Sequence, residues 1–258
     1  MKFYSEELLL SSTQKFEPIT FYSNSTWKVP RGIKQIRIVC AGAQGCGLNS
    51  SVVGGYGGVV TCILKVTPGQ TLYIVVGVAR TSNTQSYNSS DIRTESGNLY
   101  SRLIVAGGGG NYSSGSRLSY SGGNGGGTTG SPGNYGQSWS GIGGGSVYAV
   151  AQGGTQTDGG AGGACTATGY INYDNRTSGK GTFGSGGAGV GNGTAGCGGA
   201  GYFGGGGGVS GNFSDKKTQG CSVCSGAGGS SYTHPTLCSS VSHEGYNPGN
   251  GYITISMV

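Results

Sequence analysis

Alternating hydrophobic and polar residues mark short β-strands toward both ends of the chain. Residues 34–40 alternate polar and apolar side chains, and residues 251–256 do the same. This period of two predicts strands that bury one face. Residues 59–66 and 103–106 are apolar enough to be further strands, and residues 71–77 have the apolar content of a strand buried on both faces. No segment has a helical period of useful length, so the pattern predicts an all-β protein.

The predicted strands lie mainly before residue 106 and after residue 250, and a glycine-rich block separates them. We therefore expect three parts. Residues 1–26 form an N-terminal attachment segment. Residues 27–106 and 231–258 together form one β-sandwich, which supplies the hydrophobic core. Residues 107–230 are an insertion anchored at both ends by that sandwich.

Glycine dominates this insertion. The chain has 60 glycines among 258 residues, with runs at residues 107–110 and 204–208. Glycine has no side chain to bury and loses more backbone freedom on ordering than any other residue. Such a block is either disordered or packed so closely, backbone against backbone, that only glycine fits. Charged residues make up only 9% of the chain, which argues against ordinary disorder. We therefore expect a bundle of left-handed extended helices with three residues per turn, the polyglycine II form.

The charge pattern excludes several partners. The net charge of +6 is spread thinly. No basic stripe appears, so no nucleic-acid partner is expected. No apolar run approaches the roughly 18 residues of a membrane span, so no membrane insertion is expected. Residues 8–10 are too short an apolar run for a signal peptide, which predicts synthesis in a cytoplasm without entry into the secretory route.

Eight cysteines allow three interpretations. The Cys221-x-x-Cys224 pair is half of a zinc pattern, but a second pair is missing and the histidines are only His234 and His243. The cysteines can instead be buried thiols that act as small hydrophobic side chains, or they can form disulfides after release from the cell. We expect no metal.

Patterns for catalysis and cofactor binding are also missing from the sequence. The Gly-x-Gly pieces are not followed by the Lys-Ser/Thr of a phosphate-binding loop, and no Gly-x-Ser-x-Gly elbow joins a strand to a helix. The nine acidic residues are scattered, with nothing that points to a catalytic pair. We expect no catalytic residues, no cofactor and no enzymatic activity.

Several motifs in order resemble a known family. They occupy residues 27–42 (WKVPRGIKQIRIVCAG), 66–77, 91–94, 101–110, 153–157, 183–187, 201–207 and 226–232. This order is similar to the glycine-rich domain of anaplastic lymphoma kinase and leukocyte tyrosine kinase, and to its standalone bacterial and phage relatives. The resemblance implies a jelly-roll, tumour-necrosis-factor-like β-sandwich that carries polyglycine helices, and a non-enzymatic role. The chain has no kinase segment, so the phage relatives, found on tail fibres and virion appendages, are the better match.

We therefore expect a virion appendage protein, such as a tail-fibre tip or head fibre, that recognises a bacterial surface. It would sit on the virion surface, contact other virion proteins through its N-terminal segment, and assemble as a homotrimer. Its ligand would be a host cell-surface glycan or protein. Aromatic side chains in polar, non-repeating stretches suit such a ligand, because a flat apolar face stacks on a sugar. The candidate ligand-binding residues are Tyr135, Trp139, Tyr170, Tyr173 and Phe213.

Three alternatives remain open at this point. Each of those aromatic residues can serve packing alone, since buried aromatic rings usually fill space. The whole protein can be a purely structural trimeric decoration or spacer that binds only its own assembly. An enzyme on the same scaffold is a third alternative, because fold does not fix function.

Overall fold

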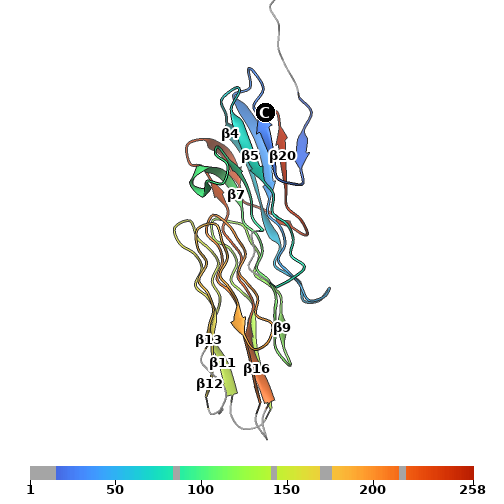
Figure 1. The fold of residues 1–258 in the computed structure, drawn as a ribbon, viewed down its shortest axis with the longest axis vertical. Coiled ribbons are helices and arrows are strands. Elements are labelled where there is room, and N and C mark those ends of the chain that lie inside the picture. Colours follow the sequence, from blue (N-terminus) through green and yellow to red (C-terminus); the bar gives the residue numbers. More distant parts are fainter. Residues whose placement is uncertain (1–15, 84–87, 141–143, 169–175, 215–218) are drawn as a thin grey trace, which may run out of the picture.

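The computed structural model describes residues 16–83, 88–140, 144–168, 176–214 and 219–258. The described chain is all β apart from one 3-10 turn, η1 (Leu99–Ser101). The molecule is elongated, with a lobe of longer strands at one end and a second group of strands at the other (Figure 1). Extended segments run between the two ends. Within the described residues, no helix has the length and apolarity to cross a bilayer.

Two sheets build the lobe that contains the C-terminus (Figure 1). Their strands are β1 (Ile19–Phe21), β2 (Ser25–Lys28), β3 (Gln35–Ala41), β4 (Gly57–Lys65), β5 (Thr71–Val75), β6 (Ser90–Arg93), β7 (Arg102–Ala106), β17 (Tyr232–Thr233), β18 (Cys238–Ser242), β19 (Tyr246–Asn247) and β20 (Tyr252–Ser256). One sheet has the order β1-β20-β3-β4-β18, with β19 also paired to β4, and the other has the order β17-β7-β6-β5-β2. We call this part the sandwich lobe.

A single hydrophobic cluster fills the sandwich lobe. Ile38 and Leu64 from the first sheet and Leu72, Ile92 and Ile104 from the second have no exposed surface. Each buried side chain of this size contributes about 1.5–3 kcal/mol relative to an exposed one. This cluster is the main hydrophobic core of the described chain.

The predicted strands can be compared with these elements. The strands expected at residues 34–40, 59–66, 103–106 and 251–256 are confirmed within a few residues as β3, β4, β7 and β20. The prediction that residues 71–77 are buried on both faces is wrong. Leu72 and Ile74 are buried, but the alternate residues of β5 are partly or fully exposed, because only one face of its sheet meets the core. The boundary expected at residue 26 falls inside β2.

Hydrogen bonds in the glycine-rich block repeat every three residues. The five amides of the run from Gly204 to Gly208 donate, in order, to the carbonyl oxygens of Thr182, Gly199, Gln152, Gly179 and Gly196. The first and fourth acceptors lie in residues 179–182, and the second and fifth lie in residues 196–199. The run therefore bonds to three separate segments in three directions. A β-strand, whose amides point alternately to two sides, cannot make this pattern.

The segments approach too closely for side chains. A Cβ atom added at Gly206 would overlap the carbonyl group of Ala161, and one added at Gly229 would overlap that of Ala200. At Gly110 the overlap would be with Gly226. These positions have ordinary backbone angles, so the requirement for glycine there is one of space and not of positive φ. Backbone polar groups satisfy one another without any side-chain core between them.

The glycine-rich block also contains strands that the sequence pattern did not predict. They are β8 (Ser113–Ser114), β9 (Ser119–Tyr120), β10 (Tyr135–Ser140), β11 (Gly144–Ala149), β12 (Ala164–Thr168), β13 (Arg176–Thr177), β14 (Val190–Gly191), β15 (Val209–Ser214) and β16 (Gln219–Cys224). They form sheets of order β10-β16-β15-β14 and β11-β12-β13, and the hairpin β8-β9. The expectation that β structure lies mainly before residue 106 and after residue 250 is therefore wrong. These stretches carry Val, Thr, Tyr and Cys among the glycines, and such side chains favour pairing as strands.

We expect that Gly206→Val strongly destabilises the protein. The new side chain would overlap the Ala161 carbonyl and separate two hydrogen-bonded segments. The free energy of unfolding should fall by at least about 3 kcal/mol, which is at the upper end of the range for overpacked cores. Thermal unfolding measures it. Gly206→Ala should also destabilise, and by more than the matched variant Gly163→Ala, because a Cβ at residue 163 meets only a tight contact of 3.2 Å with the side-chain sulfur of Cys224, which a small shift can relieve. Equal melting temperatures for the two alanine variants would contradict close backbone packing.

Candidate binding surfaces

The end of the molecule opposite the sandwich lobe is a second, smaller two-sheet unit, which we call the tip (Figure 1). Strand β11 contacts β10 and β16, and β12 contacts β15, so the two sheets face each other. Between them lies a small apolar cluster that includes Cys165, Val209 and Cys224. Burial raises the pKa of the Cys224 thiol to about 11, which keeps it a neutral, apolar group. The tip is thus held by its own core.

Three of the predicted ligand-binding residues lie on strands of the tip. Tyr135 begins β10 opposite Cys224 of β16. Trp139 of β10 and Phe213 of β15 both lie opposite Gly220, which belongs to the strand between them. The strand register therefore brings Trp139 and Phe213 to the same level of one sheet. The other two predicted residues, Tyr170 and Tyr173, lie outside the described residues.

Tyr135 lines an open groove on the flank of the glycine-rich block. The Tyr135 side chain is 56% exposed. The groove has a volume of about 650 Å³, and its other lining residues are Ser51, Val52, Ser119, Tyr120, Ser121, Pro132, Gly133 and Asn134. This volume lies within the roughly 300–1,000 Å³ of small-molecule sites. Two tyrosines with serine and asparagine side chains offer stacking faces and hydrogen-bonding groups together.

Sequence reasoning missed the partners of Tyr135 in this groove. Tyr120 comes from β9, and its hydroxyl group packs against Gly136 at a distance that leaves no room for a Cβ atom. Val52 comes from the loop after β3. The polar composition of residues 113–121 was a usable signal for Tyr120, but no pattern along the chain predicts that Val52 lines the same groove.

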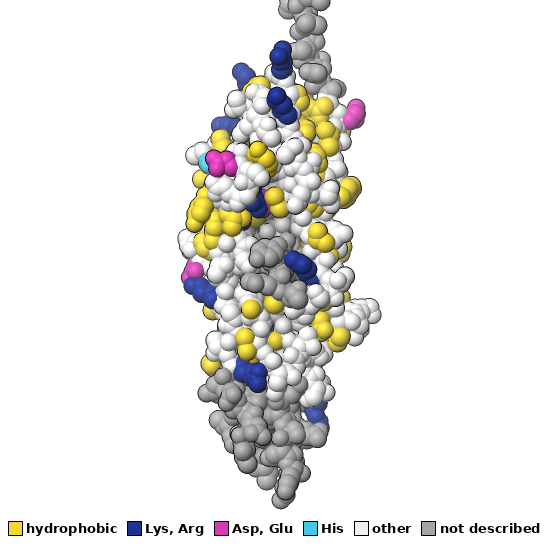
Figure 2. All heavy atoms as spheres, in the orientation of Figure 1, with side chains coloured by type: hydrophobic (Ala, Val, Ile, Leu, Met, Phe, Trp, Pro, Cys, Tyr) yellow, Lys and Arg dark blue, Asp and Glu magenta, His cyan; other side chains and the backbone are white. Residues whose placement is uncertain are grey.

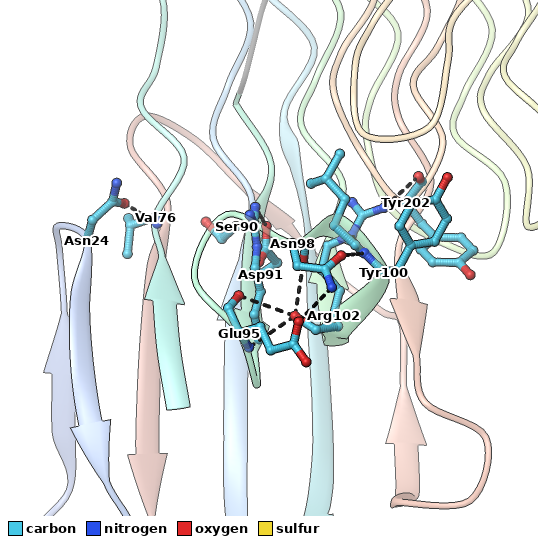
Figure 3. A network of polar contacts seen from close by, with 12 residues as sticks. Asn24, Val76, Ser90, Asp91, Glu95, Asn98, Tyr100, Arg102 and Tyr202 are labelled. Atoms are coloured by element: carbon cyan, nitrogen blue, oxygen red, sulfur yellow. Dashed lines mark hydrogen bonds and ion pairs between the residues drawn. The ribbon is translucent and has the colours of Figure 1, made fainter. Parts of the chain in front are cut away.

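A second concentration of polar and aromatic groups joins the sandwich lobe to the glycine-rich block. Arg102, the first residue of β7, is 3% exposed. Its guanidinium group donates to the carbonyl oxygens of Leu99 (2.9 Å), Gly201 (2.9 Å) and Tyr202 (3.1 Å). Figure 3 shows Arg102 beside Tyr202 in this network. Burial lowers the pKa of Arg102 to about 10, so it keeps its charge at neutral pH.

Aromatic rings surround this arginine. The guanidinium carbon lies 4.4 Å from the centre of the Phe183 ring and 5.2 Å from that of Tyr202. Tyr100 stacks on Phe183 at 4.9 Å, and Tyr202 stacks on Tyr232 at 4.0 Å. Cation–π contacts of this kind compensate the burial of a charge that has no acidic partner in direct contact. Arg102 and these rings fasten the segment at residues 201–203 onto the sandwich lobe.

The cavity beside Arg102 is too small for a ligand site of ordinary size. Its volume is about 140 Å³, below the range of small-molecule pockets. The charged groups that line it are already paired, since Arg93 donates through two nitrogens to the Asp91 carboxylate. Asp91 is buried, and this bidentate pair satisfies it. We interpret the junction as a structural fastening.

The charged side chains and the cysteines form no further candidate site of their own among the described residues. Lys, Arg, Asp and Glu side chains are scattered over the face in Figure 2 and form no continuous stripe. All the cysteines except Cys238 are buried. Among the described residues there is no group of three or more His, Cys, Asp or Glu side chains that could hold a metal ion.

Comparison with known families identifies the class of protein. The family model described as "Glycine-rich domain" matches residues 20–257, nearly the whole described chain. The chain therefore belongs to this glycine-rich domain family. A search of curated proteins found no match.

We expect that Arg102→Lys destabilises the protein by about 3 kcal/mol. A lysine ammonium cannot make the three hydrogen bonds of the guanidinium group in the same geometry, so buried carbonyl oxygens would lose their donors. Denaturant unfolding measures the change. Arg37→Lys is the matched control, because Arg37 is exposed on β3 and its replacement should be nearly neutral. Equal unfolding midpoints for the two variants would show that Arg102 does not fasten the junction.

Proposed function

We propose that this protein is a non-enzymatic virion appendage protein, such as a tail-fibre tip or head fibre, that recognises a host cell surface through its tip and the adjoining Tyr135 groove. The observation that carries the proposal is the separation of the two ends of the molecule. Strands β1 and β20 pair with each other in the sandwich lobe, so both described chain ends leave from there. The tip lies at the far end, and polar and aromatic residues flank its strand connections.

The glycine-rich block between the sandwich lobe and the tip has the properties of a rigid spacer. We propose that its segments are left-handed polyglycine II helices and that the sandwich lobe is a jelly-roll of the tumour-necrosis-factor type. The three-residue repeat of donors from Gly204 to Gly208 supports the helices, because polyglycine II has three residues per turn. A lattice tied by hydrogen bonds in three directions would hold the tip at a fixed distance from the lobe.

The recognition chemistry would rest on aromatic and amide groups. Tyr135 is exposed, and Trp139 and Phe213 lie at the same level of one sheet, on two strands separated by β16. Tyrosine and tryptophan supply a large contact area with few rotatable bonds, which favours them in recognition surfaces. A host glycan or an outer-membrane protein is the ligand class that fits such groups. No cofactor, metal or nucleic acid enters the proposal.

Assembly and location form the rest of the proposal. The sandwich lobes would form a homotrimer, residues 1–26 would contact other virion proteins, and the protein would work on the virion surface. The alternative function is a purely structural trimeric decoration or spacer that binds only its own assembly. The Tyr135 groove favours recognition over this alternative, because a spacer needs no exposed aromatic groove.

We expect that the double variant Tyr135→Ala/Trp139→Ala binds host cells at least tenfold more weakly than the parent protein. Aromatic residues in the centre of a binding surface often contribute more than 1.4 kcal/mol, which corresponds to a factor of ten. The measurement is binding of the purified protein to cells of candidate host strains. The melting temperature should change little for Tyr135→Ala, because that side chain is more than half exposed.

The matched control is Tyr22→Ala, another exposed tyrosine, which follows β1 in the sandwich lobe. It should bind as the parent does. Binding of the parent should also vary little with salt, since contacts made by Lys and Arg would weaken steeply as salt rises. A double variant that binds as tightly as the parent, or that loses binding only by unfolding, would contradict recognition through these residues.

A further inference from the structure

The outward face of the sheet β17-β7-β6-β5-β2 is covered unevenly. At β7 the side chain of Arg102 is buried beneath the rings of Phe183 and Tyr202. Toward the β2 edge, Thr26 is exposed and Tyr73 of β5 is half-buried. Successive side chains of a strand point to opposite faces, and the residues next to these two, Trp27 and Leu72, belong to the core, so Thr26 and Tyr73 face outward.

The strand register places three polar side chains in one row across this outward face. Tyr73 lies opposite Thr26 of β2 on one side and opposite Arg93 of β6 on the other. Residues directly opposite one another have Cβ atoms about 4.5–5.5 Å apart. The three side chains therefore form a continuous floor that crosses three neighbouring strands.

A groove of about 510 Å³ lies over this row, and we call it the β5 groove. Its lining residues are Asn24, Ser25, Thr26, Tyr73, Ile74, Val75, Arg93, Ser96 and Gly97. The wall at Ser96 and Gly97 belongs to a loop that is tied by hydrogen bonds, such as the one that the Asn98 amide donates to the Glu95 carboxylate at 2.8 Å (Figure 3). The groove is thus preformed, and its volume lies within the range of small-molecule sites.

We propose that the β5 groove is a binding site for an uncharged oligosaccharide. The proposal concerns the sandwich lobe alone and does not depend on recognition through the tip or the Tyr135 groove. It requires this face of the sheet to stay outside any contact between copies of the chain.

The groove presents hydrogen-bonding groups that match sugar hydroxyls. The side-chain oxygen of Asn24 accepts from the Val76 amide at 2.9 Å, which fixes the orientation of the side chain and leaves its NH2 group to donate to a ligand. Arg93 donates to Asp91 from Nε and Nη2, and Nη1 makes no hydrogen bond with the part of the chain that the structure describes. The hydroxyl group of Thr26 can donate or accept. A sugar hydroxyl can do the same, so it can pair with each of these groups.

The charge balance of the groove favours an uncharged ligand. The charge of Arg93 is already compensated by Asp91, which is buried and accepts through both carboxylate oxygens. The other lining residues carry no charge. A phosphate or carboxylate would have to compete with Asp91 for the guanidinium group, whereas a hydroxyl group can take one remaining donor and leave the ion pair intact.

Tyr73 supplies the apolar contact that a sugar ring needs. Its half-buried ring lies on the floor of the groove, which also has hydroxyl groups from Ser25, Thr26 and Ser96. An aromatic ring offers a flat apolar face for stacking, and the tyrosine hydroxyl adds a polar tip. A protein partner fits this floor less well, because the centres of protein interfaces are depleted of charged residues and this one contains an ion pair.

The test is isothermal titration calorimetry of the full chain with maltohexaose, mannohexaose and xylohexaose at millimolar concentrations, with hexagalacturonate as the acidic counterpart. We expect at least one of the uncharged hexasaccharides to bind, and hexagalacturonate to bind no more tightly than it does. Failure of all three uncharged sugars to bind, or tighter binding of hexagalacturonate, would overturn the proposal.

Tyr73→Thr should weaken binding of the uncharged sugar about tenfold, because the stacking face is lost. The matched control is Tyr252→Thr, since Tyr252 is a half-buried tyrosine that begins β20 in the other sheet. This control should bind as the parent does, and so should Tyr135→Ala, which separates the β5 groove from the Tyr135 groove. The melting temperature of Tyr73→Thr should fall no further than that of Tyr252→Thr.

Hydrogen exchange of the parent, with and without the bound sugar, locates the site even where a variant does not fold. Peptides that cover Ser96 and Gly97 should exchange more slowly when the sugar is present. Unchanged exchange there, or equal sugar affinity of Tyr73→Thr and the parent, would overturn the proposal. A parent that self-associates and is dissociated by Tyr73→Thr would also overturn it, because a second copy of the chain would then cover the groove.

Discussion

The close approach of glycine backbones is the constraint on which the rest of this structure depends. Between the two ends of the molecule there are few side chains to bury, so the hydrophobic effect cannot hold the segments together. Hydrogen bonds between backbones replace it, as in the run from Gly204 to Gly208, whose amides reach three separate segments. These bonds form only where the backbones can touch, and a Cβ atom at most of these glycines would prevent contact. The high glycine content is therefore a direct requirement of this backbone packing.

The sandwich lobe and the tip lie at the two ends of this hydrogen-bonded glycine lattice, and each has a core of its own. The sandwich lobe has a full hydrophobic core, and the tip has a smaller one around Cys165, Val209 and Cys224. Arg102 fastens the lobe to the lattice by donating to carbonyl oxygens at residues 201 and 202. A charged side chain can bind bare backbone in a way that an apolar one cannot, because the lattice presents carbonyl groups instead of side chains. An extended molecule with a separately packed unit at each end follows from this arrangement.

The sequence predicted the parts of the fold in which side chains alternate. Strands β3 and β20 follow directly from the period of two, since every second residue faces one core: Ile36, Ile38 and Cys40 in β3, and Ile253 and Ile255 in β20. Strands of the tip such as β15 and β16 were missed, because glycine and serine blur the alternation there. The error over β5 has another cause: Tyr73 and Val75 are apolar but only half-buried, and composition alone cannot distinguish them from core residues. Tyr135 was predicted from its polar surroundings, whereas the groove it lines also takes Val52 from the loop after β3 and Tyr120 from β9, which are distant in sequence.

The central claim is that the glycine amides are held in stable hydrogen bonds, and hydrogen–deuterium exchange tests it most directly. The amides of Gly204 to Gly208 donate to backbone carbonyl oxygens within the block, and all five glycines are buried. Peptides that cover this run should therefore exchange as slowly as peptides from the central strand β4, because both require opening of the folded structure. Exchange at the rate of an unstructured peptide in that run, with β4 protected, would contradict the account.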